Sequence, residues 1–227
     1  MSQILSYISI NVNENLFLKN PESSDLGKRI LREGIMLIDE IGFDDFTFKK
    51  LAKKIKSTEA SIYRYFENKH KLLLYLTSWY WAWMEYRVVF ATTNVECPKD
   101  RLERTIKLLT QEVKEDGSVP HINERILNHI LISESSKAYC TKMVEDQNSL
   151  GAYTSYKQLV QRISENVVEI NPEFKYPHML ISTVIEGSHH QRFFSEHLPK
   201  LTDVVEGEDA ITTFYTQLTL QTINNVK

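Results

Sequence analysis

The 227-residue sequence contains few residues that interrupt helices or cross-link a chain: seven Gly, six Pro and two Cys. Because glycine and proline are the strongest helix breakers, their scarcity permits long helices over most of the chain. The two cysteines, Cys97 and Cys140, are too few and too far apart for a disulfide framework or a zinc site. We therefore expect free thiols, as in a protein of the reducing cytoplasm.

Long apolar runs are also missing. No run approaches the roughly 18 apolar residues that a membrane-spanning helix needs, and the N-terminus lacks the basic start and apolar core of a signal peptide. The sequence therefore predicts a cytoplasmic chain with no membrane partner. Residues 1–22 form an arm that the pattern does not assign; a disordered segment, a short strand and an extra helix all stay open.

Motifs of enzymes and metal sites are lacking as well. We find no glycine-rich phosphate loop, no nucleophile elbow and no paired catalytic motif, so no catalytic residue and no cofactor is predicted. His189, His190 and His197 lie near one another in sequence, but no Cys or carboxylate completes a ligand set. We expect these histidines at the surface or an interface and predict no metal site. An all-helical enzyme remains an alternative, which the absence of salt-dependent binding to duplex DNA would favour.

Helical periodicity of the apolar residues runs through the rest of the chain. An all-α fold of about nine helices is predicted, and Gly42 stands where the first helix should stop. The expected helices cover residues 24–41, 47–55, 58–66, 69–94, 98–115, 121–147 (as one helix or two), a stretch between 151 and 171, 177–198 and 210–225.

Positive charge is concentrated in one block. From Phe46 to Leu72, seven Lys and one Arg accompany two Glu, a net charge of +6 in a chain whose total is −3. A compact basic block on an acidic body is typical of a local nucleic-acid contact. Charge alone is equally compatible with a solvated helix face. The sequence motif within the block must therefore distinguish a nucleic-acid contact from a solvated face.

Two short amphipathic helices are predicted inside this block. Thr47 and Thr58 are good N-cap residues, and only Lys56 and Ser57 remain for the turn between the helices. Small Ala52 permits a close crossing, so the segment is predicted to be a helix-turn-helix. The inward-facing residues are Leu51, Ala52, Ile55, Ile62 and Phe66.

In a helix-turn-helix, the start of the second helix meets base edges in the major groove. Base contacts are therefore predicted for Glu59, Ala60 and Ser61, with phosphate contacts from the tyrosines and cations that follow. The alternative is that the tyrosines only pack and the lysines are only solvated. The predicted DNA-binding set is Thr47, Thr58, Glu59, Ala60, Ser61, Tyr63, Arg64, Tyr65 and Lys69.

The block resembles the TetR family of bacterial regulators, whose pattern is roughly G-x4-T-x3-[IL]-A-x5-[ST]-x3-[IL]-Y-x-[YH]-F-x-[NS]-K-x2-L. The matching residues are Gly42, Thr47, Leu51, Ala52, Thr58, Ile62, Tyr63, Tyr65, Phe66, Asn68, Lys69 and Leu72. The resemblance implies a three-helix DNA-binding domain over residues 23–72 and a ligand-binding and dimerisation domain over 73–227. It also implies a homodimer through the last two helices and a repressor that a small molecule releases from a double-stranded DNA operator. The alternative is a TetR-like DNA-binding protein without an inducer, architectural or controlled by a protein partner.

Two departures from the family pattern matter. The usual Ala-Gly-Val of the turn is replaced by Ile55-Lys56-Ser57. Either Lys56 adopts a backbone conformation that suits glycine or the turn is reshaped, at a cost of about 1 kcal/mol. The N-terminal arm has Lys19 as its single cation, so no minor-groove contact by the arm is predicted.

Aromatic residues cluster in the fourth predicted helix. Helical spacing puts four of them on one stripe, which the resemblance places beside an inducer pocket for an apolar or aromatic ligand. A stripe of this kind is also typical of plain core, and that interpretation stays open. The predicted ligand-binding set is Trp79, Trp83, Tyr86 and Phe90, with Tyr139, Tyr153 and Tyr156 as polar additions.

Overall fold

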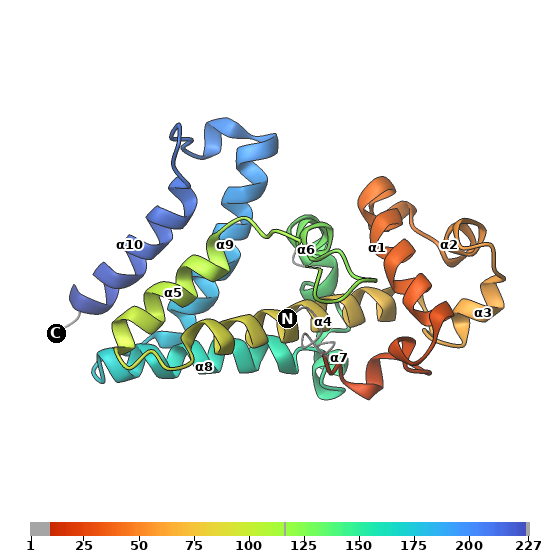
Figure 1. The fold of residues 1–227 in the computed structure, drawn as a ribbon, viewed down its shortest axis with the longest axis horizontal. Coiled ribbons are helices and arrows are strands. Elements are labelled where there is room, and N and C mark those ends of the chain that lie inside the picture. Colours follow the sequence, from red (N-terminus) through yellow and green to blue (C-terminus); the bar gives the residue numbers. More distant parts are fainter. Residues whose placement is uncertain (1–9, 116, 226–227) are drawn as a thin grey trace, which may run out of the picture. The chain divides into compact units, whose positions relative to one another are not determined.

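The structure is a computed structural model that describes residues 10–115 and 117–225. All regular secondary structure in this part of the chain is helical, which confirms the all-α prediction (Figure 1). The helices are α1 (Asp25–Asp45), α2 (Phe48–Lys54), α3 (Glu59–Tyr63), α4 (Lys69–Thr92), α5 (Pro98–Thr110), α6 (Glu124–Tyr139), α7 (Val144–Ser149), α8 (Thr154–Ile170), α9 (Pro177–His197) and α10 (Ala210–Asn225). Short 3-10 turns occur at η1 (Glu14–Leu16), η2 (Pro21–Ser23) and η3 (Pro199–Leu201).

The chain divides into two compact units. The first comprises residues 1–82 and 113–155, and the second comprises residues 83–112 and 156–227. The division falls inside α4, and it groups α6 and α7 with the N-terminal helices. Within the described residues, no helix has a stretch long and apolar enough to cross a membrane.

Helix α1 is the centre of the first unit. The Ser24 side chain caps its start by accepting a hydrogen bond from the Gly27 backbone N–H. Gly42 has φ +75°, a conformation that favours glycine, so the predicted stop at this residue is confirmed although helical hydrogen bonding resumes as far as Asp45. The face that packs inward is formed by Ile30, Leu31, Ile35 and Ile38.

The second unit is built around α9, which packs against α5 and α10. Ile181, Val184 and Ile185 lie on one buried face of α9, at the spacing expected of a helix in a core. The Arg192 guanidinium donates to the Thr110 carbonyl at 2.6 Å and pairs with Asp209 at 2.6 Å. These contacts fix α9 to the end of α5 and to the start of α10.

Several boundaries differ from the sequence-based expectation. Helix α3 ends at Tyr63 rather than at residue 66, because the Tyr65 N–H closes a tight turn on the Ile62 carbonyl at 2.8 Å. Helix α5 ends at Thr110, and residues 121–147 form two helices, α6 and α7. The described part of the N-terminal arm contains η1 and η2, while residues 1–9 of the arm lie outside the described residues.

Candidate DNA-binding site

Helices α2 and α3 begin at the two predicted caps. The Thr47 hydroxyl accepts a hydrogen bond from the Lys50 N–H, and the Thr58 hydroxyl accepts one from the Ser61 N–H, each at 3.2 Å. Each cap satisfies one of the N–H groups that a helix start leaves without a partner. Both predicted N-caps are therefore confirmed, and the two helices have fixed starting points.

The turn between α2 and α3 has the strained geometry predicted for it. Lys56 has φ +51°, and the Ser57 N–H donates to the Ala52 carbonyl at 2.9 Å, which ends α2 as a glycine-type C-cap does. The Arg29 guanidinium of α1 donates a hydrogen bond to the Ile55 carbonyl at the same turn. A cation from α1 thus fixes the point at which the chain changes direction before α3.

The first turn of α3 is open to solvent. Ala60 is exposed, and Glu59 and Ser61 are half-buried. The Ser61 hydroxyl lies 2.8 Å from the Thr58 hydroxyl, so its orientation is fixed by the cap. These three side chains form the surface predicted to read bases, and that role stays a prediction.

Tyr63 and Arg64 lie at the end of α3 with their side chains accessible. Tyr63 is 46% exposed although its ring contacts Phe48 edge to face, with 5.1 Å between centroids. Phe48 itself is buried, so α2 orients Tyr63 while leaving part of the side chain in solvent. This placement is compatible with the phosphate contacts predicted for Tyr63 and the exposed Arg64.

Tyr65 differs from its expected placement. Its side chain is 3% exposed, and its hydroxyl lies 2.7 Å from the Ser24 hydroxyl at the start of α1. The Lys19 ammonium lies over the ring, 5.2 Å from its centroid. The geometry therefore gives Tyr65 a packing role and does not favour the phosphate contact predicted from the motif.

The Lys69 ammonium also has its hydrogen-bond partners within the first unit. Its ammonium donates to the carbonyls of Phe43, Asp44 and Phe46, at 2.9, 2.9 and 3.0 Å. An ammonium has three N–H donors, so this set of partners uses all of them. Lys69 thus holds the corner between α1 and α2 (residues 43–46), and the predicted phosphate contact by its side chain is not favoured.

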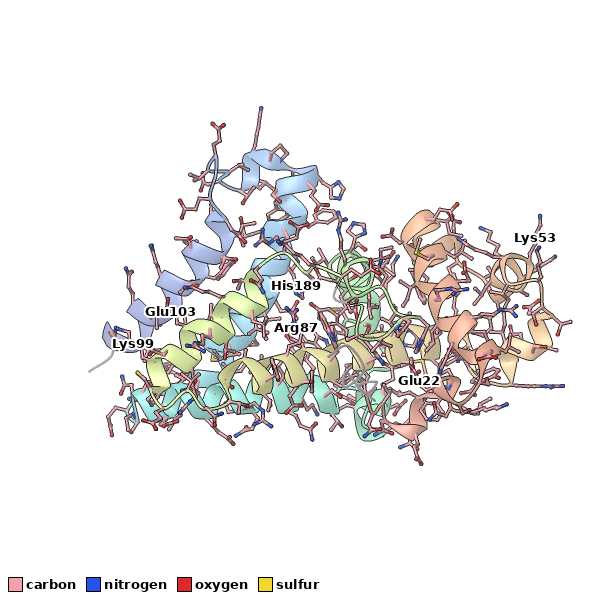
Figure 2. The ribbon with its side chains drawn as sticks, viewed as in Figure 1. Glu22, Lys53, Arg87, Lys99, Glu103 and His189 are labelled. Atoms are coloured by element: carbon pink, nitrogen blue, oxygen red, sulfur yellow. The ribbon has the colours of Figure 1, made fainter. Side chains whose placement is uncertain are left out.

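Other cations of the basic block are exposed. Lys49 and Lys53 lie one turn apart on the solvent side of α2, and Figure 2 shows Lys53 pointing away from the protein. By contrast, Lys50 donates to the Asp45 carbonyl at 2.7 Å and Lys54 pairs with Glu40 at 3.1 Å. Sequence reasoning did not single out Lys49 and Lys53, although their i, i+4 spacing opposite the apolar face was the available signal.

The predicted ligand-binding aromatics differ in exposure and are divided between the two units. Trp79 and Trp83 are each 1% exposed, whereas Tyr86 and Phe90 are 41% and 75% exposed and stack on each other. The hydroxyls of the polar additions have protein partners: Trp81 for Tyr139, Gln147 for Tyr153 and Glu186 for Tyr156. Trp79, Tyr139 and Tyr153 belong to the first unit, and Trp83, Tyr86, Phe90 and Tyr156 belong to the second.

One histidine is also placed differently from the expectation. His189 is 8% exposed within α9, not at the surface, and Figure 2 shows it among the helices of the second unit. Burial, with a smaller contribution from neighbouring His190, lowers the pKa of His189 to about 4. Cys97 and Cys140 are free and exposed.

Solved structures with a similar fold come from several proteins. The fatty acid degradation regulator FadR from Bacillus halodurans matches with a TM-score of 0.59 at 14% identity, over 88% of this chain and 98% of that one. AibR in complex with isovaleryl coenzyme A and operator DNA matches with a TM-score of 0.58 at 14% identity, over 86% and 97%. The superantigen PfiT matches with a TM-score of 0.58 at 14% identity, over 89% and 97%. At this identity the likeness shows the fold alone.

The family comparison concerns the segment that contains α2 and α3. No curated protein matches the chain. The family model for bacterial regulatory proteins of the TetR family matches residues 30–76, which run from α1 into α4 and include the two caps and the turn described above. The resemblance inferred from the motif is thus confirmed, and the chain carries the N-terminal segment of the TetR family on an all-helical fold similar to that of a solved bacterial regulatory protein of this family.

Proposed function

We propose that this chain is a sequence-specific regulator of transcription that binds a double-stranded DNA operator. The observation that carries the proposal is the solvent-open first turn of α3, which follows a capped α2 and a turn fixed by Arg29. In a helix-turn-helix, this turn enters the major groove, where base edges offer distinct donor and acceptor patterns. No catalytic role is proposed for any residue.

Phosphate contacts are assigned in this proposal to exposed side chains around α3. Lys49 and Lys53 present their ammonium groups from α2, and the end of α3 presents the Arg64 guanidinium and the Tyr63 hydroxyl. The first helix of such a unit crosses the DNA backbone while the second enters the groove, so cations on α2 suit phosphates on either side of it. Glu59, Ala60 and Ser61 then supply sequence preference.

A homodimer through α9 and α10 forms part of the proposal. One short α3 supplies little specific affinity alone, and two copies reading successive major grooves supply more. Apolar side chains exposed on these helices support the interface: Met179 on α9, with Phe214 and Leu218 one turn apart on α10, exposed by 66%, 57% and 37%. Burying such side chains against a second copy would remove apolar area from water.

The regulatory mode that we propose is a repressor released by a small molecule. Support comes from AibR, a protein of similar fold that has been solved in complex with isovaleryl coenzyme A and operator DNA. The alternative is a DNA-binding protein without an inducer. A thermal-shift screen of small molecules separates the two, because a ligand that binds the folded state raises the unfolding temperature.

Selection of bound duplexes from a random pool tests the proposed function. A single enriched motif is expected, and a two-fold symmetric motif would support the dimer. Ser61→Ala should change preference at one or two base pairs, by about 1–3 kcal/mol each, with little change in non-specific affinity. Arg104→Gln, at an exposed position on α5, is the matched control and should retain the wild-type motif. No enrichment over the input pool would refute the proposal.

A further inference from the structure

A cavity of about 570 Å³ lies within the first unit. Its wall comes from one face of α1, from Trp79 of α4 and from the segment that precedes α6. The volume falls in the range of about 300–1,000 Å³ typical of small-molecule sites. The lining residues that matter for the argument are Lys28, Arg29, Arg32, Trp79, Val119 and His121.

Cations outnumber carboxylates on this wall by three to two. Lys28, Arg29 and Arg32 are spaced along α1 so that they share one face of the helix. The acidic lining residues are Asp25 and Glu22, and Glu22 is paired with His121 at 2.7 Å. Arg32 also pairs with Glu33 at 3.1 Å, but its side chain is 54% exposed, and exposed ion pairs of this kind contribute little. The cavity therefore offers cations that an anionic group can bind.

The remaining wall is apolar. Trp79 and Val119 are buried side chains that also line the cavity, and Pro120 and Ile10 extend the apolar surface. An apolar wall next to a row of cations matches a molecule with an anionic head and an apolar body. The cations supply charge-assisted hydrogen bonds, and the wall supplies burial of the body.

Arg29 connects the cavity with the turn of the DNA-binding segment. The same guanidinium that lines the cavity donates a hydrogen bond to the Ile55 carbonyl, directly before Lys56 with φ +51°. A guanidinium has five N–H donors, so an anion in the cavity breaks this bond only by turning the Arg29 side chain toward itself, which the greater strength of a bond to a charged acceptor favours. Loss of that bond leaves a strained turn with one fewer restraint.

We propose that this cavity is an organic-anion site whose occupancy draws Arg29 from the Ile55 carbonyl and so weakens DNA binding. The inference deepens the proposed function, because it names the class of ligand and the contact through which the ligand acts. A ligand acts in this way by binding one arrangement of the turn better than the other, and DNA must weaken ligand binding by the same factor.

Fluorescence titration with anilinonaphthalene sulfonate tests the site in the full chain. Saturable one-to-one binding is expected, with binding of the uncharged analogue phenylnaphthylamine at least about tenfold weaker, since the analogue lacks the sulfonate. Lys28→Glu, which inverts a charge on the wall, should weaken sulfonate binding by at least about threefold, and Arg104→Glu on α5 should leave it unchanged. Any of three outcomes would overturn the site. They are equal affinity of the wild type for the charged and uncharged probes, equal affinity of Lys28→Glu and the wild type for the sulfonate, and no binding of the sulfonate by the wild type.

Affinity for a random duplex, with and without saturating anilinonaphthalene sulfonate, tests the coupling. The probe should weaken duplex binding by wild type. In Lys28→Glu, the probe concentration that gives half of this effect should rise by the same factor as the Kd of the probe, and an unchanged concentration would place the competition at the DNA-binding surface. In Arg29→Gln, duplex binding should already be weaker and the added effect of the probe smaller. The same effect in Arg29→Gln as in wild type would overturn the role of Arg29. A chain that binds the probe as described but binds no duplex would refute the proposed function and the coupling, and leave the anion site standing.

Discussion

Replacement of Lys69 by methionine is expected to destabilise the first unit. The lysine ammonium donates to three backbone carbonyls of the corner at residues 43–46, and its charge lies beside the C-terminal end of α1. A hydrogen bond to a charged group contributes about 1.5–3 kcal/mol when buried, and a cation at a helix C-terminus up to about 2 kcal/mol. Because Lys69 is half-buried, we expect a loss of about 2–4 kcal/mol rather than the sum of these values.

Methionine is the informative substitution because it keeps most of the aliphatic length of lysine. The Lys69 ammonium lies 4.8 Å from the centroid of the Phe43 ring, so the stem packs near this aromatic surface. Lys69→Met therefore removes the donors and the charge while retaining much of the packing. The carbonyls of Phe43 and Phe46 are partly buried and lose their donor.

Urea unfolding of the full chain measures this loss of stability. The salt dependence of duplex binding measures whether Lys69 contacts phosphate. Lys53→Met is the matched control, because Lys53 is exposed on α2. We expect Lys53→Met to retain stability within about 0.5 kcal/mol. It should lower the salt slope, which is the steepness with which the logarithm of the binding constant falls with the logarithm of salt concentration, by about 0.9. Lys69→Met should lose stability and keep the slope. An unchanged stability together with a reduced slope would show that Lys69 contacts phosphate and that the corner does not depend on it.

Three further predictions concern the turn between α2 and α3, two glycines of α1 and the buried histidine of α9. Lys56→Gly should stabilise the chain by about 1 kcal/mol in urea unfolding, because it relieves the positive φ at the turn; a loss of stability would contradict the strain. Gly27→Ala should destabilise the chain, because the added Cβ would lie 2.1 Å from the Pro21 carbonyl oxygen. Gly34→Ala should instead stabilise it by up to about 1 kcal/mol through helix propensity, since its Cβ meets Leu72 at an ordinary 3.5 Å. Equal shifts of the unfolding temperature in the two variants would refute this prediction. Burial lowers the pKa of His189 from 6.5 to about 4, so the folded state favours the neutral imidazole. The stability that neutral His189 contributes is complete above pH 6.5 and should be lost, by about 3 kcal/mol, as the pH falls toward 4. His189→Gln should flatten this pH dependence of stability, and His178→Gln, at an exposed position, should not.

Local chemistry made the framework of the DNA-binding segment predictable. Cap residues act on N–H groups two or three positions away, so Thr47 and Thr58 could be placed from the sequence. The turn could be placed for the same reason, because two residues separate the predicted helices, and Lys56 adopts the glycine-like of the two expected conformations. Gly42 likewise acts on its own backbone. Each of these signals requires information from a few adjacent residues.

The roles of Tyr65 and Lys69 depend on residues far away in the sequence. Tyr65 meets Ser24, and Lys69 meets residues 43–46, through contacts across more than twenty positions. A motif states that a hydroxyl or an ammonium is required at a position, but it does not state which acceptor the group binds. The same limit applies to the aromatic stripe of α4, where identical spacing gave buried Trp79 and exposed Phe90 because the packing around the helix changes along its length.

The corner at residues 43–46 is held from a second direction as well. The Glu134 carboxylate of α6 accepts a hydrogen bond from the Phe43 N–H at 2.9 Å, and Lys137 pairs with Glu134 at 2.8 Å and with Asp44 at 2.7 Å. The bond from Lys137 lowers the pKa of Asp44. Because α2 starts directly after this corner, its direction depends on charged side chains from α4 and α6 together.

This arrangement gives a physical reason for a lysine at the start of α4 that does not involve DNA. The C-terminal carbonyls of α1 require donors. Lys69 supplies three donors at once, and α6 supplies the matching acceptor for Phe43. A change that displaces either set of contacts therefore alters the direction in which α2 leaves α1, and with it the placement of the first turn of α3.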